Sequence, residues 1–213
     1  MATKKKKAKL VTPKAVVTWG KSLTTEGEFD GKKTGKYEGK LRFDPVIPAH
    51  AEFIEFLREA ISADVDAYLE DLKESDPKKY KIQSKWERKD PFTEELDDQG
   101  DETGMLLCKF TRSVKKGLAT FVDSGKTKMK KVPDVYGGAE IKIAYGFGKV
   151  YAMGSSKLVG VPLYMNAVQV ITLGGNSGGN ENDFDEEDGY EYDDSVAENQ
   201  VDSQGADDDE EDF

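Results

Sequence analysis

The chain has 213 residues, of which 31 are basic and 42 are acidic, so its formal net charge at pH 7 is −11. Its one cysteine excludes an internal disulfide, and one cysteine with one histidine excludes a zinc site of the usual four-ligand kind. The apolar runs are much shorter than the roughly 20 residues of a membrane span, and no apolar stretch follows the lysine-rich start. We therefore expect no metal, no membrane segment and no secretory signal.

The negative charge is concentrated at the C-terminal end. Residues 174–213 contain 17 carboxylates and no lysine or arginine, so the rest of the chain carries a net charge of +6. A run of like charge with few apolar groups cannot bury enough surface to fold, so residues 175–213 are predicted to be a disordered acidic tail. Such tails are more commonly plain solvated charge runs. The tail ends, however, in a candidate partner-binding segment made of Asp207, Asp208, Asp209, Glu210, Glu211, Asp212 and the aromatic Phe213.

The first part of the chain predicts an arm and two strands. Residues 1–13 read as a basic flexible arm, and residues 14–19 as a strand because they are β-branched and aromatic. A polar, glycine-rich loop over 21–35 separates this strand from a second one over 36–43. The second strand alternates strictly, which places Tyr37, Leu41 and Phe43 on one face and Lys36, Lys40 and Arg42 on the other.

A long amphipathic helix is predicted over about residues 49–74. Apolar residues recur there every three or four positions, at Phe53, Leu57, Ile61, Val65, Tyr68 and Leu72. The lone histidine, His50, is expected to be a surface or capping residue at the start of this helix. Residues 75–104 are polar and read as a long irregular insertion, anchored by Trp86, Phe92 and Leu96.

The second half of the chain predicts further strands. They are expected over 105–112, over 117–122 as the hairpin partner of the preceding strand, over 139–145 and over 161–173. Residues 123–126 read as a turn, and 146–160 as a glycine-rich loop. Strands with one inserted helix indicate a mainly β body over 14–174, an OB-fold-like five-stranded antiparallel barrel, with a sandwich as the alternative.

No catalytic arrangement is recognisable. Residues 124–127 resemble the end of a phosphate-binding loop, but position 120 is Thr instead of the first glycine and the segment joins two strands. Gly146-Phe147-Gly148 lacks the third glycine of a dinucleotide fingerprint. We therefore expect neither an enzyme nor a cofactor.

Basic and aromatic residues interleave in the body, which is typical of single-stranded nucleic-acid binding, because cations follow phosphates and rings stack on bases. Tyr37, Phe43, Phe110, Phe121 and Tyr145 fall on apolar strand faces and are assigned to the core. The predicted DNA-binding residues are Trp19, Lys21, Lys33, Lys36, Lys40, Arg42, Lys109, Arg112, Lys142, Phe147, Lys149 and Tyr151.

From residue 14 to the end, the chain resembles the single-stranded DNA-binding proteins of short-tailed, T-odd bacteriophages. The motifs are the strand 36–43 before a proline-bounded helix, the Asp-Ser-Gly-Lys turn at 123–126, Val132-Pro133, Tyr136-Gly137-Gly138, the strand 141–145, and an acidic end closing in Asp-Phe. Lys142 matches a basic position of the family. Ala144 stands where the family has its next basic residue, and the loop aromatic is displaced to Phe147 or Tyr151.

The resemblance implies an OB fold and sequence-independent binding of single-stranded DNA in phage replication, recombination and repair, in the cytoplasm of the infected host cell. It also implies a tail that competes with DNA for the cleft, contacts the phage DNA polymerase and helicase-primase, and can support a homodimer. The alternative is an acidic-tailed nucleic-acid mimic or chaperone that binds basic partners. The body of charge +6 favours DNA binding, because a mimic would be acidic throughout.

Overall fold

The computed structural model describes residues 10–174. Most of the predicted basic arm, the acidic tail and the partner-binding segment Asp207–Phe213 lie outside the described residues. Between residues 10 and 174, no helix combines the length and apolar character that crossing a membrane requires. The same region contains no group of three or more His, Cys, Asp or Glu side chains that could hold a metal ion.

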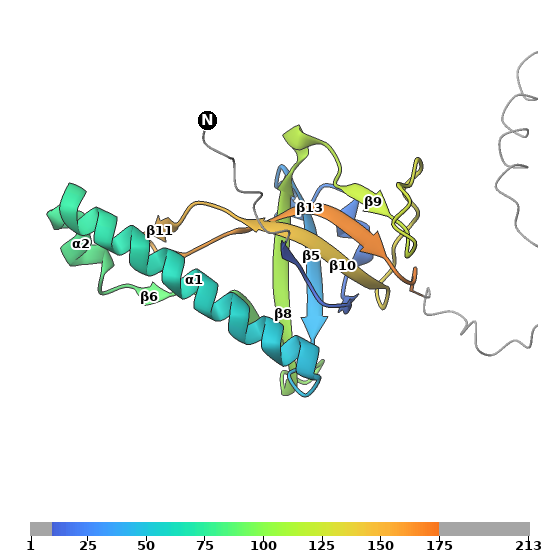
Figure 1. The fold of residues 1–213 in the computed structure, drawn as a ribbon, viewed down its shortest axis with the longest axis horizontal. Helices are drawn as coiled ribbons and strands as arrows, with labels where there is room; N and C mark the ends of the chain where they lie inside the picture. The colour runs from blue at the N-terminus through green and yellow to red at the C-terminus, as the bar shows by residue number, and fades with distance from the viewer. Residues whose placement is uncertain (1–9, 175–213) are drawn as a thin grey trace, which may run out of the picture. The chain divides into compact units, whose positions relative to one another are not determined.

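Five strands form a closed ring at the centre of the fold (Figure 1). In ring order they are β2 (Ala15–Val17), β5 (Lys36–Phe43), β8 (Glu102–Ser113), β13 (Leu163–Val170) and β10 (Glu140–Phe147), which pairs back with β2. The mainly β fold with an inserted helix is confirmed. The expectation that every pairing is antiparallel is wrong for β8 and β13, which run parallel where Thr111 faces Tyr164. An odd number of strands cannot alternate in direction around a closed ring, so one parallel pairing is unavoidable.

The core lies inside this ring, as the strand periodicities predict. Leu41, Phe110, Ile141 and Ile143 are completely buried. The residues that alternate with them on β5, Lys36, Lys40 and Arg42, are exposed. The ring therefore presents its apolar face inward and a cationic face outward.

The folded body begins earlier than predicted. Strand β1 (Leu10–Val11) pairs with β10, and Thr12 is buried beside it. The Thr12 amide donates to the carbonyl of Ile143 (3.0 Å), and the Thr12 hydroxyl accepts from the Ile143 amide (2.9 Å). Residues 10–13 are thus part of the body and not of a free arm.

The predicted helix is present as α1 (Pro48–Ser75), and its proline-bounded start is favourable because the first helical position needs no amide hydrogen. Its apolar stripe covers one end of the ring, where the ring of Phe53 lies 5.0 Å from that of Phe43 and 6.1 Å from that of Tyr145. His50 is buried, so its assignment to the surface is wrong. Its Nδ1 accepts from the Asp44 amide (3.0 Å) and its Nε2 donates to the Lys14 carbonyl (2.8 Å), which ties the helix start to the beginning of β2.

The insertion after α1 contains regular helix and strand, in contrast to the predicted irregular segment. It contains α2 (Pro77–Gln83), β6 (Glu87–Arg88) and β7 (Phe92–Leu96). The Asp76 carboxylate caps α2 by accepting from the Lys79 amide (3.2 Å), and Pro77 occupies a first-turn position. Trp86 and Phe92 pack on the core as expected, but Leu96 is 57% exposed and anchors nothing.

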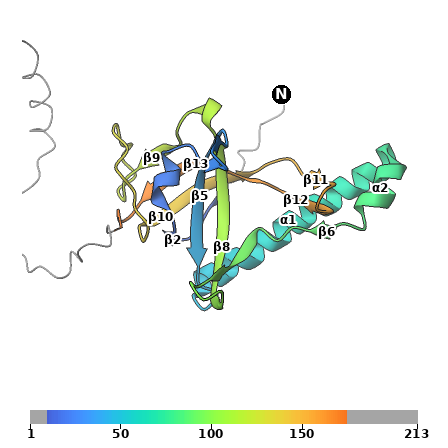
Figure 2. The ribbon, with the colours of Figure 1, turned by 180° about the vertical axis from the view of Figure 1, so that it is seen from behind.

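Two pairings could not be read from the sequence. Strand β9 (Thr120–Val122) runs parallel to β13 and does not form the predicted hairpin with β8, because η2 (Val114–Lys116) and Gly117, with a φ of 68°, turn the chain away. The glycine-rich loop contains a hairpin of β11 (Tyr151–Met153) and β12 (Leu158–Gly160), and β12 pairs with β6 (Figure 2). The remaining short elements are η1 (Gly20–Leu23), β3 (Glu28–Phe29) and β4 (Lys32–Lys33).

Candidate nucleic-acid groove

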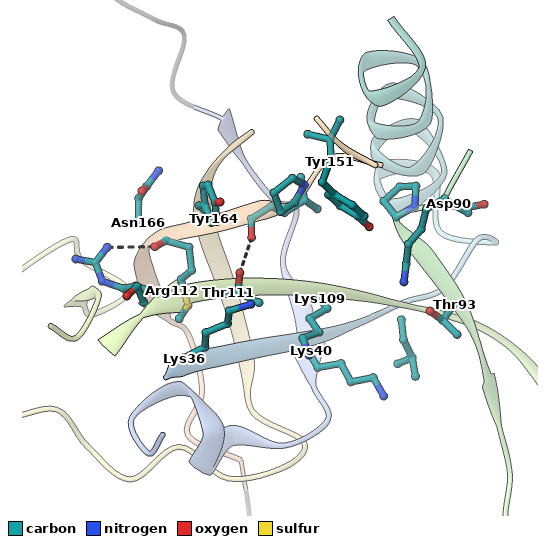
Figure 3. A pocket seen from close by; sticks show the side chains of 18 of the residues that line it. Lys36, Lys40, Asp90, Thr93, Lys109, Thr111, Arg112, Tyr151, Tyr164 and Asn166 are labelled. Atoms are coloured by element: carbon teal, nitrogen blue, oxygen red, sulfur yellow. Dashed lines mark hydrogen bonds between the residues drawn. The ribbon is translucent and has the colours of Figure 1, made fainter. Parts of the chain in front are cut away.

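A groove of about 1020 Å³ crosses the outer face of the ring (Figure 3). Its floor is formed by β5, β8 and the first half of β13. Its far wall comes from the segment after β6 and from β11. The insertion after α1 and the hairpin of β11 and β12 thus bound one side of the groove together. The pairing of β6 with β12 holds these two segments together. The Arg88 guanidinium also bonds the Ser62 hydroxyl and the Asp66 carboxylate, which attaches β6 to α1.

The groove is strongly cationic. The charged side chains that line it are Lys36, Lys40, Lys89, Lys109, Arg112, Lys116 and a single carboxylate, Asp90. That carboxylate is already neutralised, because Oδ2 accepts from the Arg58 guanidinium (2.9 Å) and Oδ1 accepts from the Phe92 amide (2.9 Å). The excess positive charge therefore remains available to a polyanion.

Two of these lysines face each other across neighbouring strands. In the antiparallel register of β5 and β8, Lys40 is directly opposite Lys109. Like charges in this position repel, because opposite residues have Cβ atoms only about 4.5–5.5 Å apart. Lys109 is compensated by Glu38 (2.6 Å), whereas Lys40 forms no ion pair with any residue between 10 and 174. A bound phosphate would relieve this repulsion.

Arg112 has a different role from the lysines. Its guanidinium donates to the carbonyls of Gly117 (2.7 Å), Lys116 (3.1 Å) and Met165 (3.2 Å). These bonds attach the turn after β8 to β13, next to the single parallel pairing of the ring. Arg112 therefore lines the groove, but its guanidinium donates to backbone carbonyls. Its main role is to hold the backbone of the site in place, and it is less available than the lysines for contact with a phosphate.

Two tyrosines add aromatic surface to the groove. Tyr151 points from β11 into the groove, and Tyr164 projects outward from β13 with 43% of its surface exposed (Figure 3). Partial burial raises the pKa of Tyr151 above its ordinary value, so its phenol loses its proton less readily than a solvated one. Both rings are positioned where a base could stack beside the lysines.

The structure brings together only some of the predicted DNA-binding residues. Lys36, Lys40, Lys109, Arg112 and Tyr151 line the groove. The others, which do not line it, are Trp19, Lys21, Lys33, Arg42, Lys142, Phe147 and Lys149.

Three of these outlying residues have clear surroundings. The Arg42 guanidinium is paired with the Glu95 carboxylate (2.6 Å). Phe147 is half-buried and packs edge-on against Tyr145, with ring centroids 5.9 Å apart, so it is part of the core packing and not an open stacking surface. Trp19 is 66% exposed but lies outside the groove lining.

Sequence reasoning missed three of the cationic and aromatic residues that line the groove: Lys89, Lys116 and Tyr164. Tyr164 could have been found, because it alternates with the buried Leu163 and Met165 and must therefore face outward. Lys89 carried no local signal, since its position depends on a backbone bond from its amide to the distant Val159 carbonyl (2.8 Å).

No model of a known protein family matches the sequence, and no curated protein matches it. Among solved structures, the chain is similar to gp2.5, a single-stranded DNA-binding protein encoded by bacteriophage T7. The TM-score is 0.58 and the identity 19%, over 86% of this chain and 98% of that one. The chain shares the fold of this T7 protein. The expected resemblance to phage single-stranded DNA-binding proteins is thereby confirmed at the level of the fold.

Structures of the single-stranded DNA-binding protein from bacteriophage Enc34 are more distant, at 12% identity. The C-terminally truncated form gives a TM-score of 0.47, over 76% of this chain and 84% of that one. The complex with single-stranded DNA gives 0.44, over 78% and 86%.

Proposed function

We propose that this protein binds single-stranded DNA without sequence preference and holds it in the groove on β5, β8 and β13. The observation that carries this proposal is the groove itself, where six cationic side chains and two tyrosines meet and the one carboxylate is already paired. Lysines neutralise phosphates regardless of sequence, and tyrosine rings stack on any base. The fold shared with the T7 protein supports the same assignment.

This is a proposal for a binding protein that catalyses no reaction, acting in phage DNA replication, recombination and repair in the cytoplasm of the infected host. The OB-like body holds the DNA. The acidic segment, with its 17 carboxylates, competes with DNA for the groove and recruits the phage DNA polymerase and helicase-primase. The competition follows from tethering, since a covalently attached polyanion has a high effective concentration near a cationic groove. Two such chains can associate as a homodimer through the same segment.

The alternative, a mimic or chaperone for basic proteins, fits the body poorly. A basic partner would be repelled by the six cations that line the groove. The cationic groove would then have no role.

Fluorescence anisotropy with labelled oligothymidine tests the proposal. Binding should weaken with salt, with a log–log slope of about −0.7 for each phosphate neutralised, and a duplex of equal length should bind much more weakly. The triple variant Lys36→Gln, Lys40→Gln, Lys89→Gln should lose affinity and flatten the slope by about 2.

The matched control removes three exposed lysines of or near α2, through Lys78→Gln, Lys81→Gln and Lys85→Gln. This control should bind as the unmodified chain does. A slope near zero, or an equal loss in the control, would contradict the proposed groove.

A further inference from the structure

A second group of lysines lies outside the groove, in the connection from β9 to β10. We call residues 126–131 the lysine loop; its four lysines, Lys126, Lys128, Lys130 and Lys131, are all exposed. None of them forms an ion pair with another residue of the described body. Between residues 114 and 133 there are six lysines and one acid, Asp123. The Asp123 carboxylate is occupied by the Thr127 amide (2.7 Å) within the turn.

The loop is held in place by its backbone and by one apolar side chain. Lys128 forms an isolated bridge with Val122, and the Met129 amide donates to the Phe121 carbonyl (3.0 Å). Met129 itself packs against the core, while the residues on either side of it are exposed. The loop thus offers cations to solvent from a fixed backbone.

The loop is connected to the outer face of β13, on which the groove also lies. Gln169 donates from Nε2 to the carbonyls of Asp123 (3.2 Å) and Ser124 (3.0 Å), the turn that precedes the loop. Along β13, Tyr164 and Asn166 line the groove, and Gln169 follows on the outward side, about 17 Å beyond Tyr164 at roughly 3.3 Å per residue. Lys142 on β10 is directly opposite Gln169.

The lysine loop lies beyond the Asn166 end of the groove, since Gln169 follows Asn166 along β13 and bonds the turn before the loop. Figure 3 shows Arg112 and Asn166 at one end of the site and Asp90 and Thr93 at the other. A strand that passes Tyr164 and Asn166 therefore continues along β13 towards Lys142 and the lysine loop. Positively charged side chains therefore continue beyond the groove, at Lys142 and in the lysine loop.

We infer that Lys142 and the lysine loop form a second segment of the DNA path, which binds the phosphates of a single strand leaving the groove past Tyr164. The contact is to the phosphodiester backbone alone, because residues 126–131 contain no aromatic ring and lysine acts as a point charge. This inference rests on the proposed function. It also gives a role to Lys142, which does not line the groove.

The test is the dependence of the loop's effect on DNA length. The full chain and the variant Lys126→Gln, Lys128→Gln, Lys130→Gln, Lys131→Gln are titrated with oligothymidines of about 6 and about 16 nucleotides, which lie towards the two ends of the range for one such domain. The control replaces four exposed lysines elsewhere, Lys78, Lys79, Lys81 and Lys85, with Gln. It removes the same charge from α2 and from Lys85, just after its end.

For the longer oligomer, the loop variant should lose at least about tenfold in affinity at low salt, and its salt slope should fall by up to about 3. For the shorter oligomer, which we expect to stay within the groove, affinity and slope should stay unchanged. The control variant should match the unmodified chain at both lengths.

Two results would overturn the inference while leaving the proposed function intact. One is an unchanged titration with the longer oligomer. The other is an equal loss at both lengths, which would mean that the loop acts on the groove indirectly, for example by holding the acidic segment away from it. If the unmodified chain binds neither oligomer, the proposed function itself is wrong.

Discussion

The ammonium group of Lys116 lies over the ring of Tyr164, 5.6 Å from the ring centroid. The two residues come from different elements, η2 and β13, and both line the groove. A cation over an aromatic face is attracted by the ring quadrupole, so Lys116 helps to hold the ring at the surface of β13. The pair offers a phosphate ligand and a stacking surface side by side.

Removing the Tyr164 ring should therefore weaken DNA binding without changing its salt dependence. Tyr164→Ala is expected to cost about 1–3 kcal/mol of binding free energy, because a base loses its stacking partner while the number of phosphate contacts stays the same. Tyr164→Phe should bind nearly as well as the unmodified chain. Trp19→Ala is the control, since Trp19 is more exposed but lies outside the groove. An equal loss in both alanine variants, measured by anisotropy, would place the DNA elsewhere.

Replacing Lys40 should weaken DNA binding without lowering the stability of the fold. In the free protein it faces Lys109, so Lys40→Gln should leave the free energy of unfolding unchanged or raise it by a few tenths of a kcal/mol. The same change should flatten the salt slope by about 0.7, because one phosphate contact is lost. Urea denaturation and salt titration measure the two effects. A stability loss without any change in slope would show that Lys40 is structural.

Arg112 should behave as a structural residue. Arg112→Lys keeps the charge but cannot reach three carbonyls, so the free energy of unfolding should fall by about 1.5–3 kcal/mol. Lys115→Gln, at an exposed neighbouring position, is the control and should be neutral. If Arg112→Lys unfolds at the same urea concentration as the unmodified chain, the three bonds contribute little to the native state.

Tyr145 should make the body less stable at high pH. Burial, with a smaller effect of nearby Cys108, raises the pKa of its phenol from 10.0 to about 12. The folded state therefore holds this proton more tightly than the unfolded state, so the stabilisation is fully present below about pH 10 and is lost as the pH rises towards 12. At pH 11 the loss should be about 1 kcal/mol. Urea denaturation at pH 9 and pH 11 should show a smaller drop for Tyr145→Phe than for the unmodified chain, and equal drops would contradict this assignment.

The sequence predicted those strands and helices whose pattern of buried and exposed residues can be read within a single segment. The alternation over 36–43 gave the inward and outward faces of β5 correctly, because a half-buried strand carries its burial pattern in its own residues. The three-to-four-residue spacing over 49–74 likewise predicted α1 to within one residue at each end. Lys36 and Lys40 could be assigned to the site for the same reason.

The parts that could not be predicted depend on distant partners. Strand β9 is only three residues long, and nothing in it distinguishes pairing with β8 from pairing with β13. The groove wall around Lys89 forms because β6 pairs with β12, far away in the chain. His50 looked exposed because it sits near prolines at a helix start, whereas its two partners, Asp44 and Lys14, are backbone groups that no side-chain pattern reveals.

The late position of β13 in the chain sets the order in which this body can be completed during synthesis. The hydrogen bond from the Thr111 hydroxyl to the Leu163 carbonyl joins residues 52 positions apart. At about 5–20 residues per second, the partner strand is made roughly 3–10 s after β8. Strand β7 covers the edge of β8 up to Cys108, but on that edge residues 109–113 remain unpaired until β13 has been made. That short stretch is an open strand edge on the nascent chain, and it is where a stalled or truncated product would first pair with another molecule.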